Sequence, residues 1–133
     1  MNVKTLILSG LLIVSSVSFG QVKQIKDANT QFRSGNYCEA ASKTELAYSK
    51  IKRKSKSGLA LKGDMAFKTA ESYRMTDNFK RANEWYEKAI LLKYQQKEPL
   101  VLLYNGDMLR QMSELKKAQD NYNAYKALVP DDP

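Results

Sequence analysis

The feature that most constrains this chain is a pattern of small and large residues that occurs three times. In each copy a small residue precedes an alanine by twelve positions, at Ala28/Ala40, Ala70/Ala82 and Gly106/Ala118. The position four residues after that alanine also corresponds in every copy, where it holds Thr44, Tyr86 and Tyr122. The position seven residues after it holds alanine in the first two copies, Ala47 and Ala89, and Tyr125 in the third. The copies are 42 and 36 residues apart. A period of this length is typical of stacked helical hairpins.

Apolar residues within the copies recur at helical spacing. In "FKRANEWYEKAILLKY" (79–94) they form a stripe of Phe79, Ala82, Trp85, Tyr86, Ala89 and Ile90. Steps of three and four residues predict one apolar helix face packed in a core. On the solvent-exposed face, Glu84 and Lys88 are predicted to form an ion pair. Turn-forming residues separate the segments, in "RSGNY", "MTDNF" and "QMSEL". We expect no strand, and helices at 22–34, 37–52, 58–75, 79–94, 98–111 and 115–128.

The second and third copies meet part of the tetratricopeptide pattern. The matching residues are Ala66, Thr69, Ala70, Tyr73, Ala82, Tyr86 and Ala89, and then Leu102, Asn105, Gly106, Leu109, Ala118, Tyr122 and Pro130. Over Gln21 to Pro130 the chain therefore resembles tetratricopeptide repeat (TPR) proteins. The resemblance implies an all-α domain at 21–130, with about three hairpins stacked into a short right-handed superhelix. Residues 131–133 would be a tail or the start of a linker. The first copy departs from the pattern at Gln24, Asp27 and Gln31, as a terminal cap would.

The first twenty residues differ from the rest. Lys4 precedes an apolar stretch from Leu6 to Val14, and small residues follow as far as Gly20. This pattern predicts a secretory signal peptide at 1–20, because the apolar run is interrupted and shorter than the roughly 20 residues that a membrane-spanning helix needs. Gln21 stands where a lipoprotein would have cysteine, so we expect an exported protein without a lipid anchor, in the periplasm or at the periplasmic face of the outer membrane.

Charge and cysteine content restrict the partners. The net charge is +8, and loss of residues 1–20 would leave +7, so the surface should attract anions. Export argues against nucleic acid as the partner. Cys38 is the only cysteine in the sequence, which excludes a disulfide within the chain. We expect it to be a small buried residue; the alternative is a thiol that pairs with another molecule.

The sequence argues against an enzyme. It contains no histidine, which removes the commonest general base and metal ligand. Its carboxylates occupy helix positions expected to face water, its glycines form no phosphate-binding loop, and Asp131 with Asp132 is a weak cation signal. We therefore expect no catalytic residues, no metal and no cofactor.

In TPR proteins the first helices of the hairpins commonly form a concave groove for peptides. Carried over by equivalent position, the resemblance implies a partner-binding groove with three rows: Ile25, Asn29 and Arg33, with Arg33 displaced by one position; Phe67, Glu71 and Arg74; and Leu103, Asp107 and Arg110. An arginine in such a groove could bind a carboxylate bidentately. Alternatively, the acid and arginine of one row, three positions apart, neutralise each other.

A basic cluster and an uncovered helix are two further candidates for contact. Lys50, Lys52, Arg53, Lys54 and Lys56 form a basic patch between the first and second copies, and this patch is either a solvated charge run or a site for an anionic glycan, a lipid or an acidic protein. The last helix has no following copy, so we expect further chain or another subunit to cover an apolar side made of Tyr122, Tyr125 and Leu128.

A narrower resemblance concerns "SFGQ", "NFKRANEWYEKAI" and "NYNAYKALVPDDP". These segments are similar to the amino-terminal part of Bacteroidota envelope proteins of the type IX (Por) secretion and gliding machinery. The resemblance implies an adaptor that binds envelope proteins during assembly of a periplasmic or outer-membrane complex. The alternative is a binder of anionic envelope glycan or lipid through the basic patch.

Overall fold

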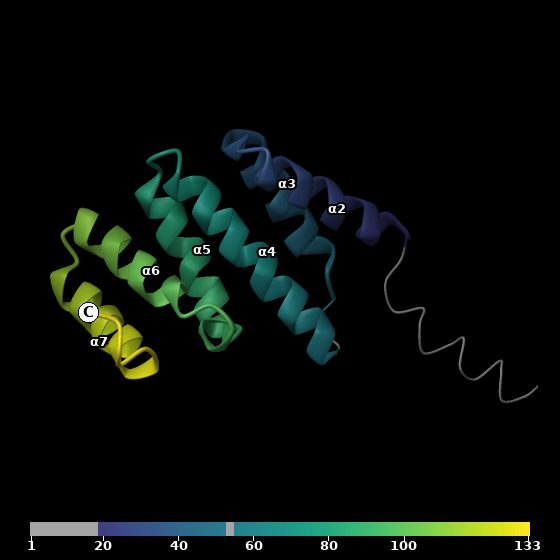
Figure 1. Ribbon diagram of the computed structural model, residues 1–133. Helices are drawn as coiled ribbons and strands as arrows, with labels where there is room; N and C mark the ends of the chain where they lie inside the picture. The colour runs from purple at the N-terminus through teal and green to yellow at the C-terminus, as the bar shows by residue number, and fades with distance from the viewer. Residues whose placement is uncertain (1–18, 53–54) are drawn as a thin grey trace, which may run out of the picture.

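The computed structural model describes residues 19–52 and 55–133, and in these residues all regular structure is helical. The helices are α2 (Phe19–Arg33), α3 (Tyr37–Lys50), α4 (Lys56–Arg74), α5 (Phe79–Leu91), the 3-10 helix η1 (Tyr94–Gln96), α6 (Leu100–Gln111) and α7 (Leu115–Leu128). Each helix packs against its neighbours along the chain, which produces a linear stack of three hairpins, α2/α3, α4/α5 and α6/α7 (Figure 1). The all-α helical repeat predicted from the sequence is therefore confirmed.

Small residues line the contacts within each hairpin. The residues that define the repeat are all buried: Ala28, Ala40, Ala70, Ala82, Gly106 and Ala118. Space is tightest at Gly106, where an added Cβ would lie only 2.5 Å from Cε1 of Tyr122. The glycine therefore lets the Tyr122 ring lie directly against the backbone of α6.

The aromatic stripe of α5 is part of the core. Trp85 and Tyr86 are buried, and the Trp85 ring meets Tyr48 of α3 edge-on, with centroids 4.9 Å apart. The predicted Glu84–Lys88 pair is replaced by other contacts. Glu84 accepts from Arg81 at 2.7 Å, and Lys88 Nζ lies 3.8 Å from the Trp85 ring centroid. The ammonium group of Lys88 is attracted to the electron-rich face of the indole.

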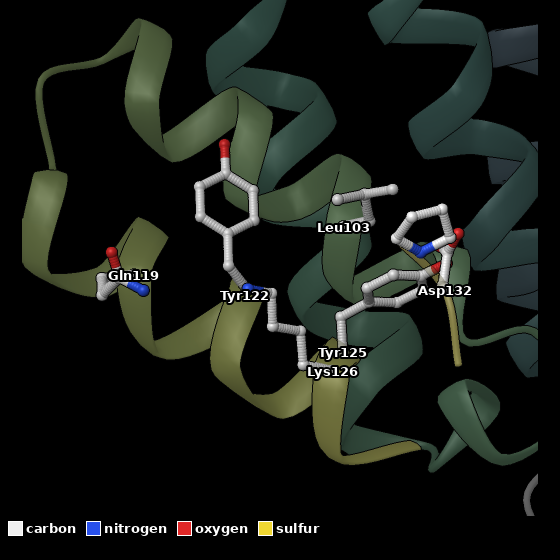
Figure 2. A pocket seen from close by; sticks show the side chains of 7 residues that line it. Leu103, Gln119, Tyr122, Tyr125, Lys126 and Asp132 are labelled. Atoms are coloured by element: carbon white, nitrogen blue, oxygen red, sulfur yellow. The ribbon is translucent and has the colours of Figure 1, made fainter. Parts of the chain in front are cut away.

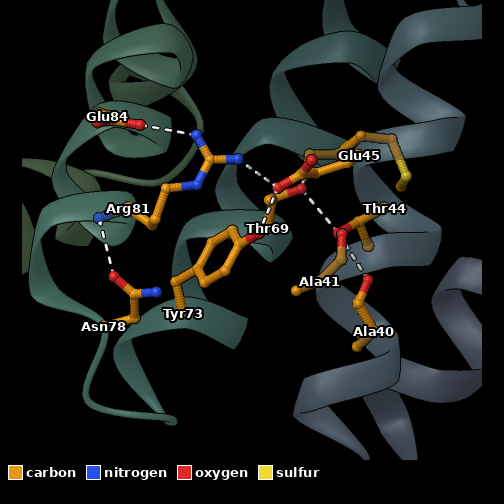
Figure 3. Close-up of polar contacts among 10 residues, drawn as sticks. Ala40, Ala41, Thr44, Glu45, Thr69, Tyr73, Asn78, Arg81 and Glu84 are labelled. Atoms are coloured by element: carbon orange, nitrogen blue, oxygen red, sulfur yellow. Dashed lines mark hydrogen bonds and ion pairs between the residues drawn. The ribbon is translucent and has the colours of Figure 1, made fainter.

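Polar contacts join the first two hairpins (Figure 3). Glu45 of α3 accepts from the Tyr73 hydroxyl of α4 at 2.5 Å and from Arg81 of α5 at 2.7 Å. Deeper in the same interface, the Thr69 hydroxyl donates to Thr44 Oγ1 at 2.7 Å, and both residues are fully buried. Because buried hydroxyls are costly unless they are hydrogen-bonded, this pair restricts how α3 and α4 can pack.

A buried asparagine restricts how α6 packs against its neighbours, α5 and α7. Asn105 of α6 is fully buried. Its side chain accepts from Asn83 at 2.8 Å and donates to Glu87 at 2.9 Å, both on α5, and it also donates to Asn121 of α7 at 3.3 Å. One side chain thus bonds to both neighbouring helices, so sliding either helix would leave a buried amide unpaired.

The three hairpin turns share one backbone geometry. Gly35, Asp77 and Ser113 all have positive φ, at 76°, 58° and 63°. In each turn the next amide reaches back five residues to a helix carbonyl, as in Asn78 N to Tyr73 O at 2.9 Å. These are Schellman-type helix ends, and their spacing equals that of the alanine repeat. The "QMSEL" segment contains no glycine, asparagine or aspartate, yet it adopts the same conformation.

The predicted helix over 79–94 is too long. Helix α5 ends at Leu91, Lys93 adopts a left-handed conformation with φ 59°, and a 3-10 turn follows. The physical reason is Tyr94, which is buried beside Gly63 of α4 and donates its hydroxyl to Asp64 at 2.9 Å. Helix α5 ends before Tyr94 because the Tyr94 ring packs against α4. Elsewhere the observed ends differ from the predicted ones by up to three residues.

Three expectations about exposure are wrong. Cys38 is exposed, because Ala40 and Ala41 occupy the buried side of α3 and a position two residues away points about 200° around the helix. Glu71, expected to face water, has only 12% of its side chain exposed, because it bonds to Arg74 and Tyr86. Tyr125 is also buried rather than uncovered, since the end of the chain folds back and its hydroxyl donates to Asp132.

The described residues contain neither a helix suited to span a membrane nor a cluster of metal-binding side chains. Across 19–52 and 55–133, no helix is both long and apolar enough to span a membrane. In the same ranges, no group of three acidic, histidine or cysteine side chains is placed to hold a metal ion. The predicted signal peptide lies outside the described residues, apart from Phe19 and Gly20 at the start of α2.

Candidate partner-binding surface

The first row of the predicted groove lines one open hollow. Ile25, Asn29 and Arg33 of α2 face it. The hollow has a volume of about 410 Å³, and its other lining residues are Val22, Lys26, Thr30 and Leu61. Leu61 comes from α4, so the hollow lies where the first helices of two hairpins meet. Asn29 is held in place, because its Oδ1 accepts from Lys68 Nζ at 2.6 Å and Lys68 also pairs with Asp64 at 2.7 Å.

This hollow combines apolar and cationic groups. Val22, Ile25 and Leu61 supply the apolar lining, and the exposed side chains of Lys26 and Arg33 supply positive charge. A concave apolar surface with a few polar groups at its edge is typical of sites that bind a side chain or a short segment. The groove predicted from the sequence did not include Val22, Lys26, Thr30 and Leu61. The length of α4 could have indicated Leu61, because this helix extends well before the aligned position Phe67.

The second row forms an internal network. Arg74 donates to both carboxylate oxygens of Glu71, at 3.1 and 2.7 Å, and to the Tyr86 hydroxyl at 3.1 Å. The Tyr86 hydroxyl in turn donates to Glu71. The guanidinium also lies 4.3 Å from the Tyr104 ring centroid, and the Phe67 ring packs against Tyr94, with centroids 5.4 Å apart. This row therefore holds α4, α5 and α6 together, and a ligand carboxylate would have to displace Glu71.

The electrostatics of the second row follow from this geometry. Burial and the neighbouring Glu71 carboxylate raise the pKa of Tyr86 above its usual value. The hydrogen bonds to Glu71 raise the pKa of Arg74, against the opposing effect of burial. Tyr86 is thus held neutral and Arg74 charged, which keeps the donor and acceptor roles of the network unchanged over a wide pH range.

The third row repeats this arrangement more loosely. The Tyr122 hydroxyl donates to Asp107 at 2.8 Å, as Tyr86 does to Glu71. Arg110 lies 4.0 Å from Asp107, and 61% of its side chain is exposed. In both hairpins a tyrosine thus bonds to an acidic residue fifteen positions earlier. This shared spacing is visible in the sequence and could have predicted the two hydrogen bonds. Of the three arginines, Arg33 and Arg110 are exposed, whereas Arg74 is engaged.

Leu103 of the third row lies in a second hollow, beside α7 (Figure 2). This hollow has a volume of about 350 Å³, and its other lining residues are Gln119, Tyr122, Tyr125, Lys126, Asp132 and Pro133. The last two residues belong to the end of the chain, which lies over the Tyr125 ring. Asp132 and Pro133 therefore lie beside α7 and cover part of it, while Leu128 stays 48% exposed.

The basic patch is only partly described. Lys50, Lys52 and Lys56 are exposed at the junction between α3 and α4, whereas Arg53 and Lys54 lie outside the described residues. The three described lysines therefore remain candidates for contact with an anion, as the sequence predicts.

Comparisons with known proteins identify no relative. No protein-family model, no curated protein and no solved structure matches this chain. The candidate function therefore depends on the geometry of the chain and on its sequence patterns.

Proposed function

We propose that this chain is an exported adaptor of the cell envelope, in which tetratricopeptide-like hairpins bind a segment of another protein. The observation that carries the proposal is the hollow between α2 and α4, which has an apolar lining and an exposed lysine and arginine at its edge. An extended or helical segment could place one apolar side chain in the hollow and an acidic group beside Arg33.

The cellular setting rests on the sequence. The pattern of residues 1–20 supports export, and the three short segments similar to type IX secretion and gliding proteins support a role in assembling a periplasmic or outer-membrane complex. An interaction role also suits the architecture, because stacked helical hairpins present extended surfaces that repeat proteins use for binding.

Site-specific crosslinking in intact cells tests the adaptor proposal. A photoreactive residue at Ile25 should yield a specific protein adduct, and the charge reversal Arg33→Glu should reduce its yield by about tenfold, the effect of losing one charge-assisted contact. A photoreactive residue at Leu46 is the matched control, since Leu46 is 44% exposed on α3 and outside the hollow. Equal adducts from both positions, or an adduct unaffected by Arg33→Glu, would exclude the hollow as the docking site.

A further inference from the structure

The antiparallel hairpins bring both inter-hairpin junctions to one end of the stack. The α3–α4 and α5–α6 connections lie along the lower side of Figure 1, opposite the hairpin turns. We name this surface the junction edge and define it by Lys50, Lys52, Lys56, Leu91, Lys93 and Lys97. The sequence places the last three about forty residues away from the basic patch, so only the fold joins the two groups.

The lysines of the junction edge form no ion pairs with other described residues. Within residues 19–52 and 55–133, none of their five amino groups forms an ion pair, and only Lys97 has a ring contact, 5.9 Å from the Tyr94 centroid. The only acid in the described parts of the two connections is Glu98, which accepts from the amide of Leu100.

Several cations at the opposite end of the stack have carboxylate partners, although Arg33 and Lys80 form no ion pair within the described residues. Near the hairpin turns, Arg74 pairs with Glu71, Arg81 with Glu45 and Glu84, and Lys117 with Glu114. The two ends therefore differ in electrostatic potential although both contain several basic residues. An anionic surface would be attracted to the junction edge in preference to the turn end.

The junction edge also exposes a large apolar side chain. Leu91, the last residue of α5, is 78% exposed, and Lys93 follows two residues later. Leu59 of α4 is 37% exposed on the turn of helix that follows Lys56. A leucine held in water next to unpaired lysines is the combination found on protein surfaces that lie at a lipid headgroup boundary, where the ammonium groups reach phosphates and the apolar group enters the interface.

We propose that the junction edge docks on an anionic lipid bilayer surface. Lys50, Lys52 and Lys56 contact headgroups from the first connection, Lys93 and Lys97 contact them from the second, and Leu91 inserts between them. A soluble polyanion would use the lysines but would gain nothing from Leu91, and the leucine therefore favours a lipid surface. The proposal does not depend on peptide binding at the α2/α4 hollow. It also uses neither Arg53 nor Lys54.

Vesicle binding by a chain that starts at Gln21 tests this proposal without the apolar segment at 6–14. The buried core of the described residues runs from Ala28 to Tyr125, so this chain retains all of it. The probes are vesicles of phosphatidylcholine alone and of an equal mixture of phosphatidylcholine and phosphatidylglycerol. We expect binding to the mixed vesicles only, weakening as salt is added.

Paired variants separate the junction edge from general positive charge. Lys93→Gln/Lys97→Gln should weaken binding about 25-fold, since each lysine near an anionic surface contributes about fivefold, and Leu91→Ser should weaken it about tenfold. The controls at the turn end are Lys116→Gln/Lys117→Gln and Leu115→Ser, in which the original side chains are also exposed. These controls should change binding less than twofold.

Selective loss in the junction variants supports the proposal. Absence of binding to the mixed vesicles overturns it, and so does an equal loss in the turn-end controls, which would show that any surface lysine suffices. Binding that is insensitive to Leu91→Ser and fully displaced by soluble polyphosphate also overturns it, since the ligand would then be a polyanion in solution.

Discussion

Contacts between neighbouring helices depend on individual glycine, alanine and tyrosine positions. Tyr86 and Tyr122 occupy equivalent places in their hairpins, and each donates to an acid on the preceding helix. At Gly106 the missing side chain makes room for the Tyr122 ring. The small residues that mark the repeat in the sequence are therefore buried between helices, and in the third hairpin one of them lies directly against the Tyr122 ring.

Adding one methyl group at Gly106 should destabilise the third hairpin. Its Cβ would meet the Tyr122 ring at 2.5 Å, and the Tyr122 hydroxyl is bonded to Asp107, so Gly106→Ala should cost about 1–3 kcal/mol of unfolding free energy in urea denaturation. In a Tyr122→Ala background the clash is absent, and the same change should be neutral or stabilising because alanine favours helix. An equal cost in both backgrounds would contradict this account.

Tyr86 should make the fold sensitive to alkali. The tyrosine is held protonated in the folded state, because burial and Glu71 raise its pKa, whereas in the unfolded chain it ionises near the ordinary value of 10.0. Its contribution to stability is therefore complete below about pH 10 and declines above it, by about 1.4 kcal/mol per pH unit.

Urea denaturation from pH 8 to pH 11 measures this decline. Tyr86→Phe should lower stability at pH 8, because the contacts to Glu71 and Arg74 are lost, and should also flatten the loss between pH 10 and pH 11. A slope identical to that of the wild-type chain would rule out Tyr86 as the titrating group.

At the scale of elements, each hairpin depends on a left-handed residue between its helices. Only the first turn uses glycine, whereas the second and third place Asp77 and Ser113 at positive φ. Side chains other than glycine pay a steric cost in this region. The turns therefore form because the packing of the helices on each side requires them, even where the local sequence is not the best one.

Replacing the aspartate in the second turn should stabilise the protein. Asp77→Gly relieves the left-handed strain at φ 58° and should raise the midpoint of thermal unfolding, corresponding to about 0.5–1 kcal/mol. The converse change Gly35→Ala, at φ 76°, should lower stability by at least as much. A destabilising Asp77→Gly would mean that the aspartate side chain contributes more than its backbone conformation costs.

At the scale of the whole molecule, stability should decrease toward both ends. Each helix contacts mainly the helices next to it in sequence, and α4 and α5 have extensive contacts on both sides. In a stack of this kind stability is approximately a sum of nearest-neighbour terms. In the described residues, α2 and α7 each have extensive contacts with one helix only, although residues 129–133 partly cover α7 at Tyr125.

Amide hydrogen exchange should show this gradient. We expect the strongest protection in α4 and α5 and the weakest in α2 and α7, because the ends can unfold while the centre stays packed. Mass spectrometry of peptides from each helix would measure it. Equal protection in all six α-helices described here would instead indicate a single cooperative unit.

Much of the fold could be predicted from the sequence because its signals are local. Steps of three and four residues, the buried alanines and the turn segments lie within one hairpin, so the chain alone determined an all-α repeat and the approximate positions of its helices. The groove rows were predicted in the same way, from equivalent positions in the three copies, and the groove itself stays a prediction. Periodicity identifies which side of a helix is apolar or carries the repeated residues. It does not show which residues of other helices that side contacts.

Only the tertiary structure decided the partners of the individual side chains. Lys68 bonds to Asn29, 39 positions away, and Tyr86 bonds to Glu71, 15 positions away; such pairs depend on how the helices cross. Packing of Tyr94 against α4 ended α5 at Leu91. The fold also engaged Arg74 with Glu71 and Tyr86 and left Arg33 exposed beside an apolar hollow. The antiparallel hairpins likewise brought two sets of lysines to one edge. Distance along the chain does not fix distance in space, and for this reason the candidate surfaces became visible only in the folded molecule.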